Sequence, residues 1–231
     1  MPRQHHRVTG TLLAATLAGI PLLPVTATAA PTSDGTAEIF TFADQADGSL
    51  DTPVGTSTLA RDKSGISATF RTGQLRAHHA YTLWIVVFNR PENCAQPCNE
   101  DDIFVGGDPR GPMNTATIKA ADIHAVYGGG KVADASGTTR IDTHLPVRDA
   151  SREDLLAKVN PGAALKETQG AEVHLVLRSH GPKISGQVEE QLGSYAGGCT
   201  TFLHPPAVPK NEGECADLQF AVHPPQARAA R

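Results

Sequence analysis

The stretch Ala80–Cys98, AYTLWIVVFNRPENCAQPC, constrains the fold of this chain most. From Tyr81 to Phe88 both alternating sets of side chains are largely apolar, and aromatic and β-branched residues are frequent. Successive residues of a strand point to opposite faces, so this segment needs cover on both. It is too short to cross a membrane, which takes about 20 apolar residues. We therefore expect the central strand of a sheet, with Trp84 buried between two layers.

The first 29 residues have the features of a signal peptide. A short basic opening, MPRQHHR, precedes an apolar centre, and Ala27–Ala29 supply the small residues that signal peptidase accepts. Pro21 and Pro24 interrupt the apolar run, which argues against a membrane anchor. We predict secretion with cleavage near Ala29, a disordered leader at residues 30–36, and no transmembrane segment in the mature chain.

The charge of the chain bears on its partners. Losing Arg3 and Arg7 with the signal peptide changes the formal net charge from −4 to −6. A mildly acidic protein is a poor match for nucleic acid or an anionic membrane, so neither is an expected partner. The mature chain is long enough for one sizeable domain, and its 22 glycines and 17 prolines indicate many turns.

Short strands separated by turns are predicted along most of the mature chain. The expected strands are residues 37–42, 54–62, 65–75, 77–89, 114–127, 138–145, 171–182 and 217–223. One short helix is predicted at Ser151–Val159, capped by Ser151 and stopped at Asn160 and Pro161. With so little helix, parallel strands would lack their crossovers. We expect an all-β, antiparallel β-sandwich, immunoglobulin-like or superoxide-dismutase-like, spanning residues 37–224, followed by a flexible tail at residues 225–231.

The four cysteines are predicted to form two disulfides. An even number of cysteines in an exported chain indicates disulfide bonding. We favour Cys94 with Cys98 and Cys199 with Cys215, because each pair brackets a loop rich in proline and polar residues. Disulfide-pinned loops should result. A zinc site is the weaker alternative, since the second pair is too widely spaced for a zinc knuckle.

Histidines on neighbouring strands raise a second hypothesis, a copper or zinc site. His174 and His180 lie on one face of the predicted strand 171–182, but about 20 Å of strand separates them. A shared ion would need ligands from adjacent strands, such as His144 beside His180 or His174. The alternative is an ordinary solvated polar face. The hypothesis requires three ring nitrogens to converge from the set His124, His144, His174, His180 and His223.

Other reactive patterns give little support for catalysis. No GxSxG sequence is present, and all four cysteines are expected to be bonded, so no nucleophile is indicated. Glu100, Asp101 and Asp102 form an acidic cluster without the spacing of an EF-hand, which favours a solvated loop over a calcium site. We predict no catalytic residues.

The phrases YTLWIVVFNRPENC, KVADASGTT and AEVHLVLRSHGP, with the closing DLQFAVH, resemble a group of exported bacterial proteins of unknown function. More distantly, the order of an apolar strand, the GGGKVADASGTT hairpin and a later HGP is similar to the CHRD domain, a secreted β-sandwich module. The resemblance implies a sandwich fold. The CHRD pattern usually has a second histidine just before its HGP, where this chain has Arg178 and Ser179.

Together these features predict a secreted, non-enzymatic module. Its loops would contact an extracellular or cell-envelope component, and no cofactor would be required. The alternative is a copper- or zinc-binding protein or metalloenzyme on the same scaffold, with His144, His174 and His180 as candidate ligands.

Overall fold

A computed structural model describes residues 33–94, 97–109 and 111–226 of the chain. The predicted signal peptide, residues 30–32 of the leader and residues 227–231 of the tail lie outside the described residues. The first strand already begins at Ser33, so residues 33–36 pair with a neighbouring strand where we had expected a disordered leader. At the other end, the Gln226 N–H donates to the Gln169 carbonyl, so the start of the predicted tail is attached to the domain.

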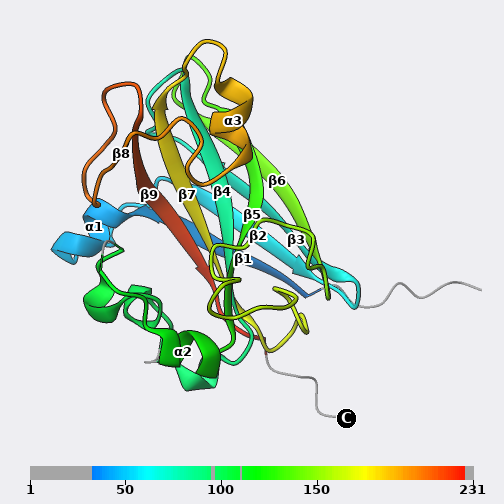
Figure 1. The fold of residues 1–231 in the computed structure, drawn as a ribbon. Helices are drawn as coiled ribbons and strands as arrows, with labels where there is room; N and C mark the ends of the chain where they lie inside the picture. Colours follow the sequence, from blue (N-terminus) through cyan, green and yellow to red (C-terminus); the bar gives the residue numbers. More distant parts are fainter. Residues whose placement is uncertain (1–32, 95–96, 110, 227–231) are drawn as a thin grey trace, which may run out of the picture. The chain divides into compact units, whose positions relative to one another are not determined.

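The described chain forms one antiparallel sheet in which nearly every expected strand is present (Figure 1). Its strands are β1 (Ser33–Thr41), β2 (Gly55–Arg61), β3 (Gly65–Thr72), β4 (His79–Phe88), β5 (Ile123–Val132), β6 (Thr139–Pro146), β7 (Glu172–Pro182), β8 (Thr201–Phe202) and β9 (Glu214–His223). The order is β5-β4-β7-β9-β1-β2-β3-β6, and the short β8 pairs in parallel with β9. The prediction of a mostly-β antiparallel fold is confirmed.

The sheet curves until it is nearly closed and barrel-like. Strand β1 belongs to both halves, since residues 33–39 pair with β2 while Phe40 and Thr41 pair with β9. The two end strands, β5 and β6, approach each other, and the Lys131 ammonium donates to the Arg140 carbonyl across the gap. The halves that a sandwich would place in separate sheets are therefore continuous here.

The central strand β4 is buried along its whole length, as its sequence predicts. Tyr81, Leu83, Ile85 and Val87 point into the main core between the two halves of the sheet. The outer face is covered differently: Val86 and Phe88 pack against helix α2 (Thr115–Ala120) and neighbouring loops. Trp84, also on this face, is 2% exposed and meets Tyr127 and Tyr195 edge-on. Tyr127 is the neighbour of Trp84 on β5 in the same sheet, so the layer over Trp84 includes the loop residue Tyr195.

The helices are short and lie mostly where we did not expect them. They are α1 (Phe42–Asp47), α2 (Thr115–Ala120) and α3 (Val188–Gly193), with 3₁₀ turns η1 (Pro91–Asn93), η2 (Glu100–Asp102) and η3 (Val105–Gly107). Helix α3 lies against β4 and β5 (Figure 1). The strand expected at residues 114–127 is wrong in its first half, because Asn114 caps α2 by accepting from Thr117 N–H. The strand also continues past the expected end at residue 127, because β5 runs through Gly128–Gly130 to Val132.

The helix predicted at Ser151–Val159 is wrong, and this segment forms turns instead. Asp154, expected in the first helical turn, is bound to β5. Its carboxylate accepts from the Ala125 N–H at 3.1 Å and lies 2.7 Å from Nδ1 of the buried His124. These long-range contacts outweigh the few tenths of a kcal/mol that local helix propensity offers.

Within the part of the chain that the structure describes, no helix is long and apolar enough to cross a membrane.

Candidate functional site

A pocket of about 700 Å³ lies against the outer face of the sheet, over β4 and β7. Trp84, Val86 and Phe88 line it from β4, and His174 and Val176 from β7. The pairing register places Trp84 beside Val176 and Val86 beside His174, so alternate residues of both strands form one continuous floor. Cavities that bind small molecules in proteins commonly have this volume.

Loops that are distant in sequence form the walls. They come from α1, from residues 99–113, from the 155–156 turn and from residues 195–205. The segment 99–113 directly follows the Cys94–Cys98 disulfide, and His204 lies inside the loop closed by Cys199–Cys215. Both predicted pairings are confirmed, and no described cysteine is free. The disulfides therefore pin two of the walls.

The surface of the pocket is mainly aromatic and aliphatic. Five of the chain's eleven Phe, Tyr and Trp residues line it. They are Phe42, Trp84, Phe88, Phe104 and Tyr195. The Trp84 indole N–H is already used, since it donates to Thr82 Oγ1 at 3.0 Å. The indole therefore offers a ligand its carbon surface and π electrons.

Two polar groups of the floor have partners within the protein. His174 Nε2 lies 2.8 Å from Glu172 Oε1, and its ring packs on Phe88 with centroids 4.8 Å apart. Asp217 forms a 2.8 Å ion pair with Arg178, whose guanidinium stacks 3.8 Å from the centroid of Tyr195. Burial raises the pKa of the Tyr195 phenol, which stays neutral. The polar groups of the floor are thus already paired within the protein and do not need a ligand as partner.

The mouth of the pocket is more polar than its floor. Glu100 and the exposed Asp101 lie there, and Gln45 of α1 donates to Glu100 at 3.3 Å, which links α1 to the 99–113 loop. On another side, His204 Nε2 lies 3.4 Å from Asp108 Oδ1 and so connects the two disulfide-pinned loops. The predicted acidic cluster is divided: Asp102 is buried and accepts from the Asn99 N–H.

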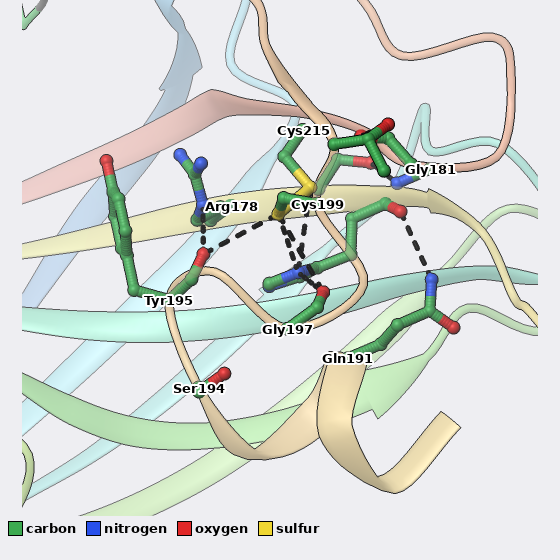
Figure 2. Close-up of a disulfide and its surroundings, with 12 residues drawn as sticks. Arg178, Gly181, Gln191, Ser194, Tyr195, Gly197, Cys199 and Cys215 are labelled. Atoms are coloured by element: carbon green, nitrogen blue, oxygen red, sulfur yellow. Dashed lines mark hydrogen bonds between the residues drawn. A yellow bond between two sulfur atoms is a disulfide. The ribbon is translucent and has the colours of Figure 1, made fainter. Parts of the chain in front are cut away.

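Figure 2 shows the Cys199–Cys215 disulfide beside Gly197. His180 lies against this disulfide, with its Nδ1 3.6 Å from Cys199 Sγ. Its Nδ1 lies 2.8 Å from the Gly197 carbonyl, so Nδ1 carries the proton. Its Nε2 lies 2.9 Å from Thr82 Oγ1, which itself receives the Trp84 N–H. This chain of hydrogen bonds suits a neutral imidazole. Burial lowers the pKa of His180 to about 4.

The structure does not bring the three predicted metal ligands together. His144 is exposed on β6 beside Ser67, His174 lies in the pocket, and His180 is buried six residues further along β7. Among the described residues, two groups of three ligand atoms do lie close enough for one ion. One is His180, Cys199 and Cys215, and the other is Cys94, Cys98 and Asp102. Each includes both sulfurs of a disulfide, which cannot act as thiolates while they are bonded.

Sequence reasoning missed the pocket. The available signal was the outer-face set of β4, Trp84, Val86 and Phe88, which needed cover although the sequence showed only one weak helical pattern. Phe104 and Tyr195, which also line the pocket, come from loops whose positions depend on the fold.

Comparisons with family models, curated proteins and solved structures gave no match for this chain. The resemblance to CHRD domains and to exported bacterial proteins therefore stays a prediction, and a function has to be argued from the pocket itself.

Proposed function

We propose that this chain is a secreted, non-enzymatic binding protein that holds a small, mainly apolar molecule in the pocket over β4 and β7. The observation that carries the proposal is a pocket of about 700 Å³ with an aromatic and aliphatic floor, whose polar groups are paired within the protein. Burying an apolar ligand there gains about 25 cal/mol per Å² of apolar area removed from water. The described lining residues include no serine, cysteine or lysine, so the usual nucleophiles are missing from this part of the pocket.

Secretion is supported by the signal-peptide pattern of residues 1–29 and by two disulfides, which persist in oxidising compartments. The CHRD-like sequence order and the antiparallel sheet favour a relative of secreted β-sandwich modules, immunoglobulin-like or superoxide-dismutase-like, whose sheet has become nearly continuous. The ligand would then come from the extracellular medium or the cell envelope.

Filling the pocket should abolish binding. Val176 lies on the floor, and Val176→Phe adds bulk directly into the space that a ligand needs. We expect 4-phenylbutan-1-ol, a neutral probe, to bind wild type saturably and the variant at least about fivefold more weakly. Trp84 is the only tryptophan and lines the pocket, so its fluorescence reports occupancy, and calorimetry gives the dissociation constant independently.

The matched control is Val208→Phe, the same substitution at a site that is 43% exposed and does not line the pocket. It should bind like wild type. Equal binding by the Val176→Phe variant, with its thermal unfolding unchanged, would contradict the proposal.

A second candidate function is copper or zinc binding, favoured by one observation. His180 Nδ1 lies 3.6 Å from Cys199 Sγ and 3.8 Å from Cys215 Sγ. Two electrons from an external thiol or phosphine reductant would open the disulfide and give two thiols. Their thiolates, with His180, are a ligand set that suits zinc or cuprous copper. His180 would have to release the Gly197 carbonyl to bind through Nδ1.

This candidate predicts metal binding that depends on reduction. Oxidised protein should take up no stoichiometric Co²⁺, a spectroscopic substitute for Zn²⁺, whereas phosphine-treated protein should bind about one equivalent with thiolate-to-metal charge-transfer absorption. His180→Gln should weaken that binding, while His144→Gln, on exposed β6, should not. Reduced protein that binds Co²⁺ no better than a Cys199→Ser/Cys215→Ser variant would exclude the site.

A further inference from the structure

We infer from the charges around the pocket that its ligand is an organic cation, an amine or quaternary ammonium group carried on an aromatic or aliphatic body. The inference rests on the proposed binding function and names the ligand class. It follows from two independent observations: the sign of the unpaired charge at the mouth and the concentration of aromatic rings around the pocket.

Among the described residues of the mouth, the unpaired charge is negative. Asp217, His174 and His204, three of the ionisable lining residues, each have an oppositely charged or hydrogen-bonded protein partner. The remaining two are Glu100 and Asp101, and neither carboxylate forms an ion pair with a described residue. No lysine or arginine occurs among the described lining residues. A cation entering the pocket is attracted by both carboxylates, whereas an anion is repelled.

The aromatic rings that line the pocket provide a second attraction for cations. Aromatic faces carry negative electrostatic potential and bind ammonium groups within about 6 Å of the ring centroid. Five aromatic residues line this one pocket. One wall already makes such a contact within the protein, since the Arg178 guanidinium stacks 3.8 Å from the Tyr195 centroid and 5.2 Å from that of Phe202.

The two features lie at different depths, which defines the shape of the ligand. Asp101 is exposed and Glu100 is partly exposed, so the carboxylates lie at the mouth. Val86, Phe88 and Val176 form the apolar floor. A ligand that satisfies both has its charged group near Glu100 and Asp101 and its apolar body against β4 and β7.

Three probes of one shape test the charge preference. The ammonium of 4-phenylbutylamine, the hydroxyl of 4-phenylbutan-1-ol and the carboxylate of 4-phenylbutanoate differ only at the polar end. We expect the amine to bind at least about fivefold more tightly than the alcohol, and the carboxylate more weakly than either. Raising the salt concentration should reduce the preference for the amine and leave the affinity for the alcohol unchanged, because salt screens exposed charges.

Two double variants test whether Glu100 and Asp101 cause the preference for the amine over the alcohol. Glu100→Gln/Asp101→Asn should bring the affinities for amine and alcohol to within about twofold of each other. The control Glu38→Gln/Glu212→Gln removes the same number of exposed charges away from the pocket and should keep the wild-type preference. Unchanged affinity for the alcohol in both variants shows that the pocket is intact.

The outcomes separate the inference from the function on which it rests. Equal affinity for the three probes, or tightest binding of the carboxylate, overturns the cation inference while the binding function stands. An amine preference that survives in the Glu100→Gln/Asp101→Asn variant also overturns it. If none of the probes binds and Trp84 fluorescence does not change, the proposed function fails as well.

Discussion

Lowering the pH from about 7.5 to about 4.5 should reduce the free energy of unfolding by about 5 kcal/mol, a large part of the stability of a typical domain. Two histidines are responsible. His180 is fully buried against the second disulfide, and His223 is 3% exposed beside Ser57, with Nε2 and Oγ 2.8 Å apart. Burial lowers the pKa of each to about 4, from an ordinary value of 6.5.

The sign follows from where the protons bind. Between pH 6.5 and pH 4 the unfolded chain binds a proton at each of these histidines and the folded chain does not. The stability that the neutral histidines contribute is complete above pH 6.5 and is lost as the pH falls toward 4. Each histidine accounts for about half of the expected loss over the stated pH range, at 1.36 kcal/mol per pKa unit. Arg178 near His180, and Arg61 and His174 near His223, add to the cost of protonation, while Asp217 partly offsets it at His180.

Urea denaturation at the two pH values measures this loss. His180→Gln and His223→Gln each remove one titrating group, so each variant should lose only about half as much stability as wild type on acidification, whatever its stability at neutral pH. His144→Gln is the matched control, because His144 is exposed. If both the His180→Gln and the His223→Gln variants lose as much unfolding free energy on acidification as wild type does, groups other than these histidines are responsible.

Replacing Arg61 by methionine should destabilise the protein by about 3–5 kcal/mol. Arg61 is 1% exposed, and its guanidinium donates to the carbonyls of Thr168, Ala171, His223 and Pro224. Burial lowers its pKa to about 10, so it stays charged at neutral pH. Methionine fills much of the same space but donates no hydrogen bond, which leaves buried carbonyls without a donor.

The control for this variant is Arg71→Met on the adjacent strand β3. Arg71 is exposed, and we expect a change within about 0.5 kcal/mol. Urea denaturation of both variants at neutral pH makes the comparison. If the two variants lose equal stability, the contacts of Arg61 are not what holds residues 168–171 and the end of β9 in place.

Much of the fold could be predicted from local sequence. The β-prone runs and the turn signals between them place β2, β3, β4, β6, β7 and β9 within a few residues of their observed bounds. Both disulfide pairings also followed from the chain, because each pair of cysteines brackets a single loop. The alternation of side chains along a strand and the spacing of cysteines around a loop depend only on residues close in sequence. The sequence therefore predicts them without knowledge of distant partners.

The errors occur where a side chain has a distant partner. The 151–159 segment has a good capping residue and a good stop signal, yet Asp154 binds His124 on β5 and the helix does not form. Residues 114–121 alternate like a strand, but Asn114 caps a helix that covers Phe88. The histidines His174 and His180 share a face of β7 as predicted, but their partners are Glu172 and Thr82 rather than a common metal ion.

The sequence by itself determined that β4 would be buried on both faces, that the sheet would be antiparallel, and that the cysteines would pin two loops. Only the tertiary structure decided which segments cover the outer face of β4. These segments do not fill all the space over the strand, and the unfilled space is the pocket. The physical reason is that strand register and loop placement bring Trp84, Val176, Phe104 and Tyr195 together from four separate segments. A cavity is the space that these packed segments leave unfilled, so no local pattern of residues encodes it.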